Sequence, residues 1–312
     1  MTAGPPLDMP LLVIGECLID AVERGDQPPE LHVGGSPANV AFGLSALEYD
    51  VSLATWFGQD GMGRRIADRC ACSGTKVVQG SDRAQRTSVA RAVLDQSGSA
   101  TYEFDLSWEL PELFGLDRFA HVHTGSIAAV LEPGGSQTLL AVQKARPTAT
   151  ISYDPNVRPS LMGTPDQARP RIEQLVALAD VVKASDEDLA WLYPDRSVPD
   201  TLRDWGRLGA LFTVVTRGAE GALYALPQAG SLASCPARQG GLVDTVGAGD
   251  SFMAGLLSGL LDAGLLGGPS ARERLRTASL DDVQPAVERA VMTGGITVSK
   301  AGAYAPVRAE LG

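Results

Sequence analysis

The sequence has few cysteines, few histidines, few aromatic residues and fewer basic than acidic side chains. The four cysteines (Cys17, Cys70, Cys72 and Cys235) are scattered and only three histidines accompany them, which disfavours a zinc site and predicts reduced thiols in a cytoplasmic protein. No apolar run approaches membrane-spanning length, so we expect no membrane partner. A net charge of −11 disfavours nucleic acid as a partner, because binding its phosphates needs a basic surface.

What the sequence does contain is a regular alternation of short apolar runs and amphipathic segments. Strand-like runs occupy residues 11–14, 51–57, 121–124, 149–153, 180–183 and 211–216. This alternation predicts βαβ units, and therefore a mostly parallel central sheet with helices on both faces, a three-layer αβα sandwich. No linker or repeat interrupts the chain, so residues 1–312 are expected to form a single domain.

Residues 87–104 break this rhythm with two alternating strands joined by the turn-forming segment Asp95-Gln96-Ser97-Gly98. A hairpin inserted into a parallel α/β scaffold is a candidate lid over the carboxyl ends of the strands, where ligands bind. We therefore expect a small β-sheet lid formed by about residues 15–35 and 86–107. An apolar face left over on such a lid would be a natural contact between two copies, so we expect a homodimer.

The most informative segment is Asp244-Thr245-Val246-Gly247-Ala248-Gly249-Asp250-Ser251-Phe252, which leads into an apolar helical stretch. Its Gly-Ala-Gly turn offers backbone N–H groups at a helix start, which is an anion site suited to phosphate. A carboxylate in the same turn repels phosphate, so Asp250 makes sense if it takes a proton from an attacking hydroxyl. The alternative is a core helix with an aspartate near its start for dipole reasons.

A second group of polar residues lies near the start of the chain. Asp20 follows the first strand, and Gly34 and Gly35 precede Ser36-Pro37 and Asn39. Ser36 and Pro37 predict a helix N-cap followed by proline at the first helical position. The glycines permit close backbone approach, and Asp20 and Asn39 carry carboxylate and amide groups that suit sugar hydroxyls. The residues alone equally allow a plain turn with Asn39 as a cap.

Both groups resemble the signatures of the PfkB/ribokinase family of carbohydrate kinases. Residues 34–63 resemble the first signature and residues 244–252 the second, and residues 152–159, 182–189 and 215–221 match, in order, segments of bacterial fructokinase-like members. The resemblance covers about residues 11–306. It implies a ribokinase-type fold and ATP-dependent phosphorylation of a primary hydroxyl on a small unphosphorylated sugar, with fructose as the first choice.

The resemblance also implies a role for each matched residue. The catalytic base would be Asp250, beside an anion hole formed by Gly247, Ala248 and Gly249. The sugar would contact Asp250, Asp20, Gly34, Gly35 and Asn39. ATP would contact Asn156, Arg158, Lys183, Ser185, Thr216, Gly218, Gly221 and Gly249. Asp188 would serve Mg²⁺, and a monovalent cation such as K⁺ would lie near Asp244, Val246, Thr297, Lys300 and Gly302.

The sequence departs from the family pattern at two places. Asp188 stands where many members have glutamate, which shortens the reach of the carboxylate, and Ser36-Pro37 replaces the lysine and glycine of ribokinases, which disfavours ribose. A 2-keto-3-deoxygluconate kinase, a ribokinase, a nucleoside kinase and a catalytically silent sensor are the alternatives. A dinucleotide-dependent oxidoreductase is disfavoured, since no G-x-G-x-x-G follows the first strand.

Three further features have plain explanations. Gly61 to Arg65 lacks the spacing of a phosphate loop and predicts a turn before a basic helix. His121 and His123 alternate on a strand, which predicts placement in the core or at its rim. Arg158 either faces the phosphates or caps a helix, and we place it nearer the nucleotide. Because a phosphorylated sugar needs a basic partner, we expect unphosphorylated sugars to be preferred.

Overall fold

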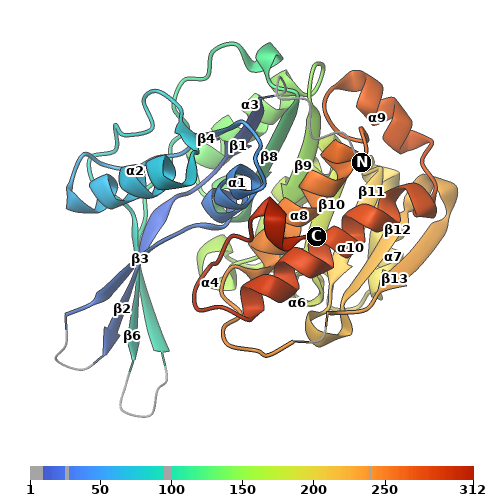
Figure 1. The fold of residues 1–312 in the computed structure, drawn as a ribbon. Coiled ribbons are helices and arrows are strands. Elements are labelled where there is room, and N and C mark those ends of the chain that lie inside the picture. Colours follow the sequence, from blue (N-terminus) through green and yellow to red (C-terminus); the bar gives the residue numbers. More distant parts are fainter. Residues whose placement is uncertain (1–9, 25–27, 95–99, 239) are drawn as a thin grey trace.

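The computed structural model describes residues 10–24, 28–94, 100–238 and 240–312, and they form a large central sheet and a separate small one (Figure 1). The central sheet has nine strands in the order β13-β12-β11-β10-β9-β8-β1-β4-β5. Its strands are β1 Leu11–Ile14, β4 Val51–Ala54, β5 Lys76–Val77, β8 His121–Gly125, β9 Thr150–Asp154, β10 Val181–Ser185, β11 Phe212–Thr216, β12 Ala222–Leu226 and β13 Ser231–Cys235.

The central sheet is parallel from β5 to β11, as the sequence predicts. Every residue of β1, β8 and β9 is buried, which fits strands covered on both faces. The strand expected at residues 51–57 ends earlier, at Ala54, because the chain then turns to pair the Phe57 amide with the Ser81 carbonyl. Strand β12 pairs antiparallel with β11 and with the edge strand β13, and neither β12 nor β13 was predicted.

The small sheet contains the hairpin that interrupts the alternation. Its order is β3-β2-β6-β7, with β2 Leu18–Arg24, β3 Glu30–Gly34, β6 Val89–Leu94 and β7 Ala100–Asp105. Strands β2 and β6 pair in parallel, and each pairs antiparallel with its outer neighbour. These strands lie within the ranges expected for the lid and project from the body of the molecule (Figure 1). The turn at residues 95–98 lies outside the described residues.

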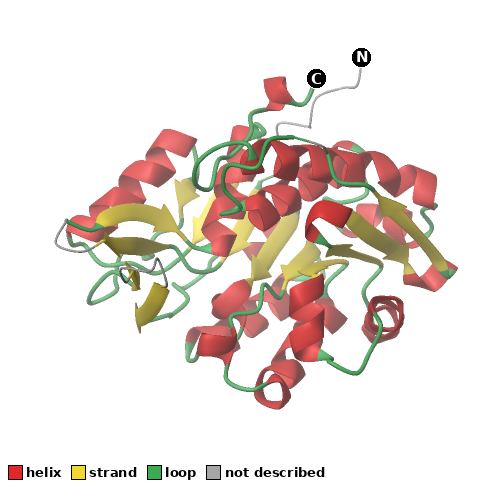
Figure 2. Cartoon of the chain, turned by 90° about the horizontal axis from the view of Figure 1, so that it is seen from below, coloured by secondary structure: helices red, strands yellow, loops and turns green. Residues whose placement is uncertain are grey.

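Helices cover both faces of the central sheet, which completes the expected three-layer ribokinase-type sandwich (Figure 2). One face packs against α1 Ser36–Ala46, α2 Gly61–Ser73, α8 Ala248–Asp262, α9 Pro269–Arg276 and α10 Leu280–Val298. The other packs against α3 Gly134–Ala145, α4 Pro159–Met162, α5 Pro165–Leu178, α6 Asp186–Leu192 and α7 Val198–Leu208. Short 3₁₀ turns are η1 Leu116–Arg118, η2 Ser126–Ala129, η3 Gly218–Glu220, η4 Pro227–Ala229 and η5 Arg308–Glu310.

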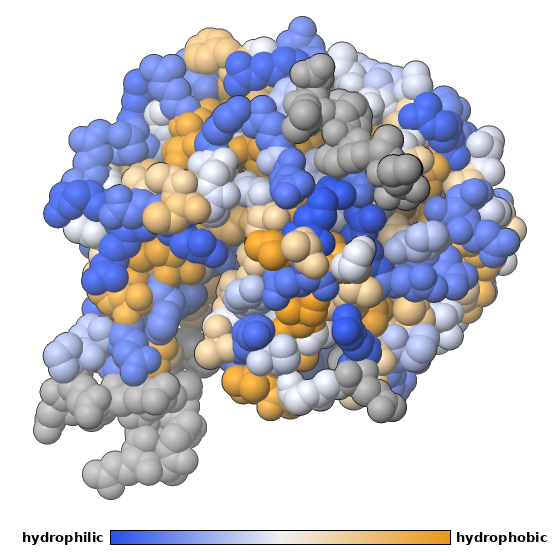
Figure 3. Space-filling model, viewed as in Figure 1, coloured by the Kyte–Doolittle hydropathy of each residue, from blue (hydrophilic) through white to orange (hydrophobic). Residues whose placement is uncertain are grey.

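The surface agrees with the polar composition. The face seen in Figure 3 is mainly hydrophilic, with apolar patches interspersed among charged residues. Among the described residues, no helix is long and apolar enough to cross a membrane.

Helix α8, which begins with the Gly-Ala-Gly turn, is buried along nearly its whole length and packs closely against α10. A Cβ added to Gly259 would lie 2.5 Å from the Cα of Ala286, and one added to Gly255 would lie 3.0 Å from the Cα of Ala290. Such distances require the two helix backbones to move apart. The small residues of α8 therefore set its position, and with it the position of the turn at its start.

We expect Gly259→Ala to destabilise the protein by about 1–3 kcal/mol, because overpacking against Ala286 outweighs the better helix propensity of alanine. Gly294→Ala in α10 is the matched control. There the added Cβ would lie 3.5 Å from its nearest neighbour, so the change should be neutral or stabilise by up to about 1 kcal/mol. Urea unfolding measures both, and a Gly259→Ala protein as stable as the control would contradict the close-packing argument.

Candidate functional site

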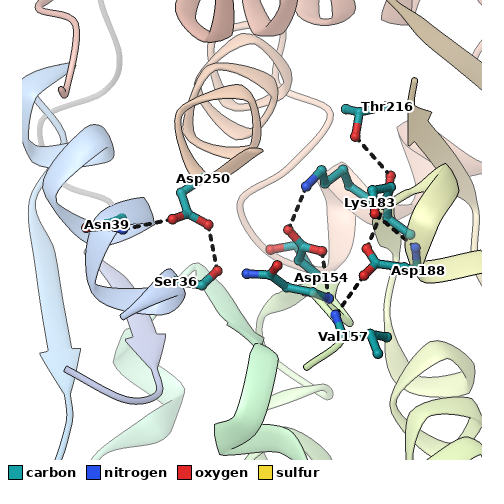
Figure 4. Close-up of polar contacts among 12 residues, drawn as sticks. Ser36, Asn39, Asp154, Val157, Lys183, Asp188, Thr216 and Asp250 are labelled. Atoms are coloured by element: carbon teal, nitrogen blue, oxygen red, sulfur yellow. Dashed lines mark hydrogen bonds and ion pairs between the residues drawn. The ribbon is translucent and has the colours of Figure 1, made fainter. Parts of the chain in front are cut away.

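The expected site residues converge at the carboxyl edge of the parallel strands, where α/β sheets bind ligands. Gly15 follows β1, Asp154 ends β9, Ser185 ends β10 and Thr216 ends β11. The starts of α1 and α8 face this edge. Figure 4 shows side chains from these elements gathered around Asp250 on one side and around Lys183 on the other.

The turn that opens α8 has the geometry of an anion site. Gly247 is the N-cap in the left-handed conformation, with φ 74°, and a Cβ there would lie 2.6 Å from the Cβ of Ala303, so glycine is required. The first N–H groups of a helix lack helical acceptors, and the helix dipole adds a positive field. The amide of Ala248 donates locally to the Thr245 carbonyl at 3.2 Å. The turn thus presents backbone donors, most openly around Gly249.

Asp250 lies in the first turn of α8, with only 8% of its surface exposed. Its carboxylate accepts two hydrogen bonds from α1, from Ser36 Oγ at 2.6 Å to Oδ1 and from Asn39 Nδ2 at 2.8 Å to Oδ2 (Figure 4). The expectation that Ser36 caps α1 is wrong: Gly35 is the N-cap, without a side-chain hydrogen bond, and Ser36 is the first helical residue. The side chains of both Ser36 and Asn39 donate hydrogen bonds to Asp250 instead.

The residues expected to hold the sugar lie next to Asp250, where the small sheet meets α1. A Cβ on Gly34 would lie 2.0 Å from Oδ2 of Asp20, and a Cβ on Gly35, which has φ 108°, would lie 2.4 Å from the carbonyl oxygen of Glu16. Gly34 therefore lets the end of β3 lie against the Asp20 side chain of β2, and Gly35 lets the start of α1 approach the Glu16 backbone. Burial raises the pKa of Asp20, and electrostatic interactions with His32 and Arg158 oppose this effect.

A buried ion pair lies under the anion turn. Lys183 Nζ donates to Asp154 Oδ2 at 2.9 Å, and both side chains are almost fully buried. A Cβ on Gly249 would lie 3.1 Å from Lys183 Nζ, so the ammonium group faces the turn. Burial raises the pKa of Asp154 to about 6 and the charge of Lys183 opposes this, which leaves the pair charged at neutral pH. Lysine at this position supplies positive charge next to the backbone donors.

The expected nucleotide residues follow β11 and the neighbouring strands. Thr216 Oγ1 donates to the Ala184 carbonyl at 3.4 Å, and Gly218 has φ 50° with open space around its Cα. Gly221 has φ 86°, and a Cβ there would lie 2.1 Å from the Cys235 carbonyl oxygen, so the need for glycine at this position is structural. Ser185 caps α6 by accepting the Asp188 amide at 3.0 Å.

Asn156 and Arg158 lie in the loop after β9. Arg158 Nη1 donates to Asn156 Oδ1 at 2.7 Å and to the Val157 carbonyl oxygen at 3.0 Å, so the guanidinium folds back on its own loop. Its charge also acts on Asp20 and Glu16 by lowering their pKa values against the effect of burial. Arg158 is therefore within electrostatic reach of the sugar side of the site as well as being the N-cap residue of α4.

Asp188 ties two loops together in this structure. Its Oδ1 accepts the Val157 amide at 2.7 Å and its Oδ2 accepts the Ser185 amide at 2.8 Å. Each oxygen retains further lone pairs, so the carboxylate is compatible with a water-mediated contact to Mg²⁺. Among the described residues, no group of three or more His, Cys, Asp and Glu side chains is arranged to hold a metal.

The loops expected to bind a monovalent cation are joined by Asp244. Its Oδ1 accepts the Val246 amide at 3.0 Å and its Oδ2 accepts the Gly302 amide at 2.8 Å, and these donors lower its pKa. Thr297 Oγ1 donates to the Tyr304 carbonyl at 2.9 Å, and Lys300 Nζ lies 5.9 Å from the centre of the Tyr304 ring. The two carbonyl-bearing loops thus lie side by side, an arrangement that suits a hard cation.

Two histidines expected in the core or at its rim lie in the core. His121 and His123 are fully buried on β8, and Ser152 Oγ lies 2.8 Å from His121 Nε2 and 2.9 Å from His123 Nδ1. Burial lowers the pKa of each to about 3, so both are neutral.

No motif in the sequence predicts a role for Glu16. It is 7% exposed in the segment that connects β1 to the small sheet, and its Oε2 accepts the Ala128 amide at 3.2 Å. Burial raises its pKa to about 7, and hydrogen bonds from the Ser126 side chain and the Ala128 backbone partly oppose this. The segment before the small sheet is thereby attached to the loop after β8.

A turn with the geometry of an anion site, beside a buried carboxylate on a three-layer sandwich, suits phosphoryl transfer, and the comparisons with known proteins agree. Residues 10–310 match the model of the pfkB family carbohydrate kinases. The chain belongs to this family and is an ATP-dependent sugar kinase.

Individual relatives give the same picture. The chain is 34% identical to a fructokinase of Klebsiella pneumoniae over 81% of this chain and 85% of that protein. It is 32% identical to fructokinase-1 of Zea mays over 100% of this chain and 98% of that protein. The structure of the fructokinase of Vibrio cholerae O395, solved with fructose, ADP and a calcium ion, matches this fold with a TM-score of 0.80. The two sequences are 27% identical, and the match covers 97% of this chain and 98% of that chain. A double mutant of that enzyme, solved with fructose, ADP and a potassium ion, also has a TM-score of 0.80. It is 26% identical, and the match covers 99% of this chain and 98% of that chain.

The buried Glu16 carboxyl predicts a pH-dependent difference in stability. An unfolded glutamate ionises near pH 4.5 and the folded one near pH 7, so between these values only the unfolded chain has lost the proton. Stability therefore falls as pH rises through this window. Glu16→Gln removes this loss, so the free energy of unfolding of the variant relative to wild type should rise by about 3 kcal/mol from pH 4.5 to pH 7.

Urea unfolding across this pH range measures the difference, with exposed Glu109→Gln as the control that should give a flat line. A flat line for Glu16→Gln as well would show that Glu16 ionises normally in the folded protein.

Proposed function

We propose that the protein is a fructokinase, which transfers the terminal phosphoryl group of ATP to the 6-hydroxyl of fructose. The observation that carries this proposal is the buried Asp250 carboxylate, held by α1 in the same turn that offers anion-binding amides. Asp250 accepts the proton of the sugar hydroxyl, whose oxygen forms a bond to the γ-phosphorus. The bond between that phosphorus and the bridging oxygen breaks, and ADP leaves.

The phosphate end of the site is proposed to lie between the α8 turn and β11. The amides of Gly247, Ala248 and Gly249 and the ammonium of Lys183 would stabilise charge on the transferring group, because they are preorganised and partly shielded from water. The residues proposed to contact the remainder of ATP are Asn156, Arg158, Ser185, Thr216, Gly218 and Gly221.

The sugar end is proposed to lie between α1 and the small sheet, which would act as a lid. Asp20 and Asn39 supply polar groups there, and Gly34 and Gly35 let the backbone approach. Arg91 on β6 is already paired with Glu23 at 3.0 Å and with Glu103 at 3.4 Å, which argues against a role in binding a sugar phosphate. Arg158 has electrostatic reach to Asp20, so it is the residue that a sugar phosphate would use.

Mg²⁺ and K⁺ are proposed as the ions of the reaction. Mg²⁺ neutralises charge on the β- and γ-phosphates when bound, and it is usually held by substrate phosphates with one or two carboxylates. Asp188 is the carboxylate proposed here. K⁺ would bind between the loops joined by Asp244, near the carbonyl groups of Val246, Thr297, Lys300 and Gly302.

We also propose a cytoplasmic homodimer. The small sheet has edge strands, β3 and β7, and an edge strand can pair with a second copy. The four free cysteines support a reducing compartment. Sedimentation equilibrium that gives the mass of one chain at micromolar concentration would contradict the dimer.

Replacing the proposed base tests the chemistry. Asp250→Asn keeps the shape of the side chain but cannot accept the proton, so kcat should fall by roughly two to four orders of magnitude. ATP binding, measured by calorimetry, should largely survive because the carboxylate does not bind phosphate. A variant with nearly wild-type kcat would remove Asp250 from the mechanism.

A coupled ADP-release screen tests the substrate. We expect kcat/KM to be highest for fructose among hexoses, pentoses, 2-keto-3-deoxygluconate and nucleosides, and higher for fructose than for its 1- and 6-phosphates. Preference for a phosphorylated sugar would overturn the substrate proposal and assign Arg158 to the phosphate. Preference for a nucleoside or keto-acid would assign the protein to a different member class of the same family.

A further inference from the structure

Ser36 departs from the usual behaviour of a serine at a helix start. A serine at the N-cap ordinarily accepts a hydrogen bond from a backbone N–H group of its own helix, which satisfies one of the first donors of the helix. In α1 the N-cap is Gly35, without a side-chain hydrogen bond, and the Ser36 hydroxyl instead donates to Asp250 Oδ1 at 2.6 Å. This distance is in the range of a hydrogen bond to a charged oxygen. The hydroxyl therefore forms a hydrogen bond with a residue 214 positions away in the sequence rather than with its own helix.

The backbone around Ser36 is held on both sides. Gly35 has φ 108° and lies so close to the Glu16 carbonyl that a Cβ would stand 2.4 Å from its oxygen. The ring of Pro37 lies so close to Gly15 that a Cβ there would stand 2.2 Å from Pro37 Cγ. Ser36 itself is 7% exposed. Its hydroxyl is consequently fixed at Asp250 by packing against the 15–16 segment, not by the chance rotamer of a surface side chain.

Ser36 and Asn39 each donate a hydrogen bond to one of the two oxygens of the Asp250 carboxylate. Asn39 holds Oδ2 and Ser36 holds Oδ1, so rotation of the carboxylate about its Cβ–Cγ bond is restrained from both sides (Figure 4). A proton acceptor loses efficiency when its lone pair is misdirected, because proton transfer needs alignment. Both donors also interact more strongly with the ionised carboxylate than with the neutral acid.

We propose that Ser36 is a positioning residue for the base, which orients the Asp250 carboxylate toward the proton of the sugar hydroxyl during phosphoryl transfer. The proposal rests on the proposed function. Ser36 acts through Asp250 and makes no chemical step itself: the proton of the sugar hydroxyl passes to Asp250, while the Ser36 proton stays on its own oxygen.

Ser36→Ala tests this role with fructose and ATP. Loss of a hydrogen bond to a charged group predicts a fall in kcat of about ten- to a hundredfold, with little change in KM for ATP. Ser45→Ala is the matched control, since Ser45 lies in the same helix and bonds to Thr75 Oγ1, far from the base.

A double-mutant cycle separates positioning from folding. In an Asp250→Asn background, Ser36→Ala should have almost no further effect on the residual rate, because Ser36 acts only through the carboxylate. A full additional loss in that background would overturn the proposal, as would a wild-type rate in the Ser36→Ala variant. Failure of the fructokinase proposal is recognised separately, as wild-type protein that does not phosphorylate fructose or an Asp250→Asn variant that retains full activity.

Discussion

Two hydrogen bonds to the Asp250 carboxylate connect the start of α1 with the start of α8. They matter because α8 also forms the Gly-Ala-Gly turn, so the same helix fixes both the proposed base and the amides proposed to contact the phosphoryl group. The position of α8 depends in turn on Gly255 and Gly259, which let it pack against α10 at backbone distance. Close packing of α8 against α10 thus determines the geometry on which the proposed proton transfer and charge stabilisation both depend.

The site balances one buried positive charge against several acidic groups. Lys183 faces the turn and is paired with Asp154, while Asp250 and Asp20 are acidic groups at the proposed sugar side. A lysine buried without Asp154 would tend to lose its proton. The ion pair therefore keeps an ammonium group available beside the turn in a protein whose overall charge is strongly negative. Local backbone and lysine donors, not net charge, suit this region to phosphate.

Much of this arrangement could be predicted from the sequence. Buried apolar runs and their spacing identified the parallel strands β1, β4, β8, β9, β10 and β11 but not the short β5, and the turn residues after β6 identified the small sheet as an interruption. The antiparallel strands β12 and β13 were missed, because short mixed runs such as Ser231–Cys235 carry no clear period. The Ser36 contact could not be predicted either: local preference points to a cap, and its partner is 214 residues away.

The central claim, that Asp250 faces a primary hydroxyl of a sugar while the α8 turn faces the terminal phosphate, is tested most directly by a crystal structure. The complex should contain fructose and a non-hydrolysable ATP analogue. We predict the 6-hydroxyl oxygen within about 3 Å of an Asp250 carboxylate oxygen, in line with the γ-phosphorus, and a γ-phosphate oxygen within hydrogen-bond distance of the Gly249 amide. A sugar bound with no hydroxyl at Asp250, or a γ-phosphate remote from the turn, would contradict the account.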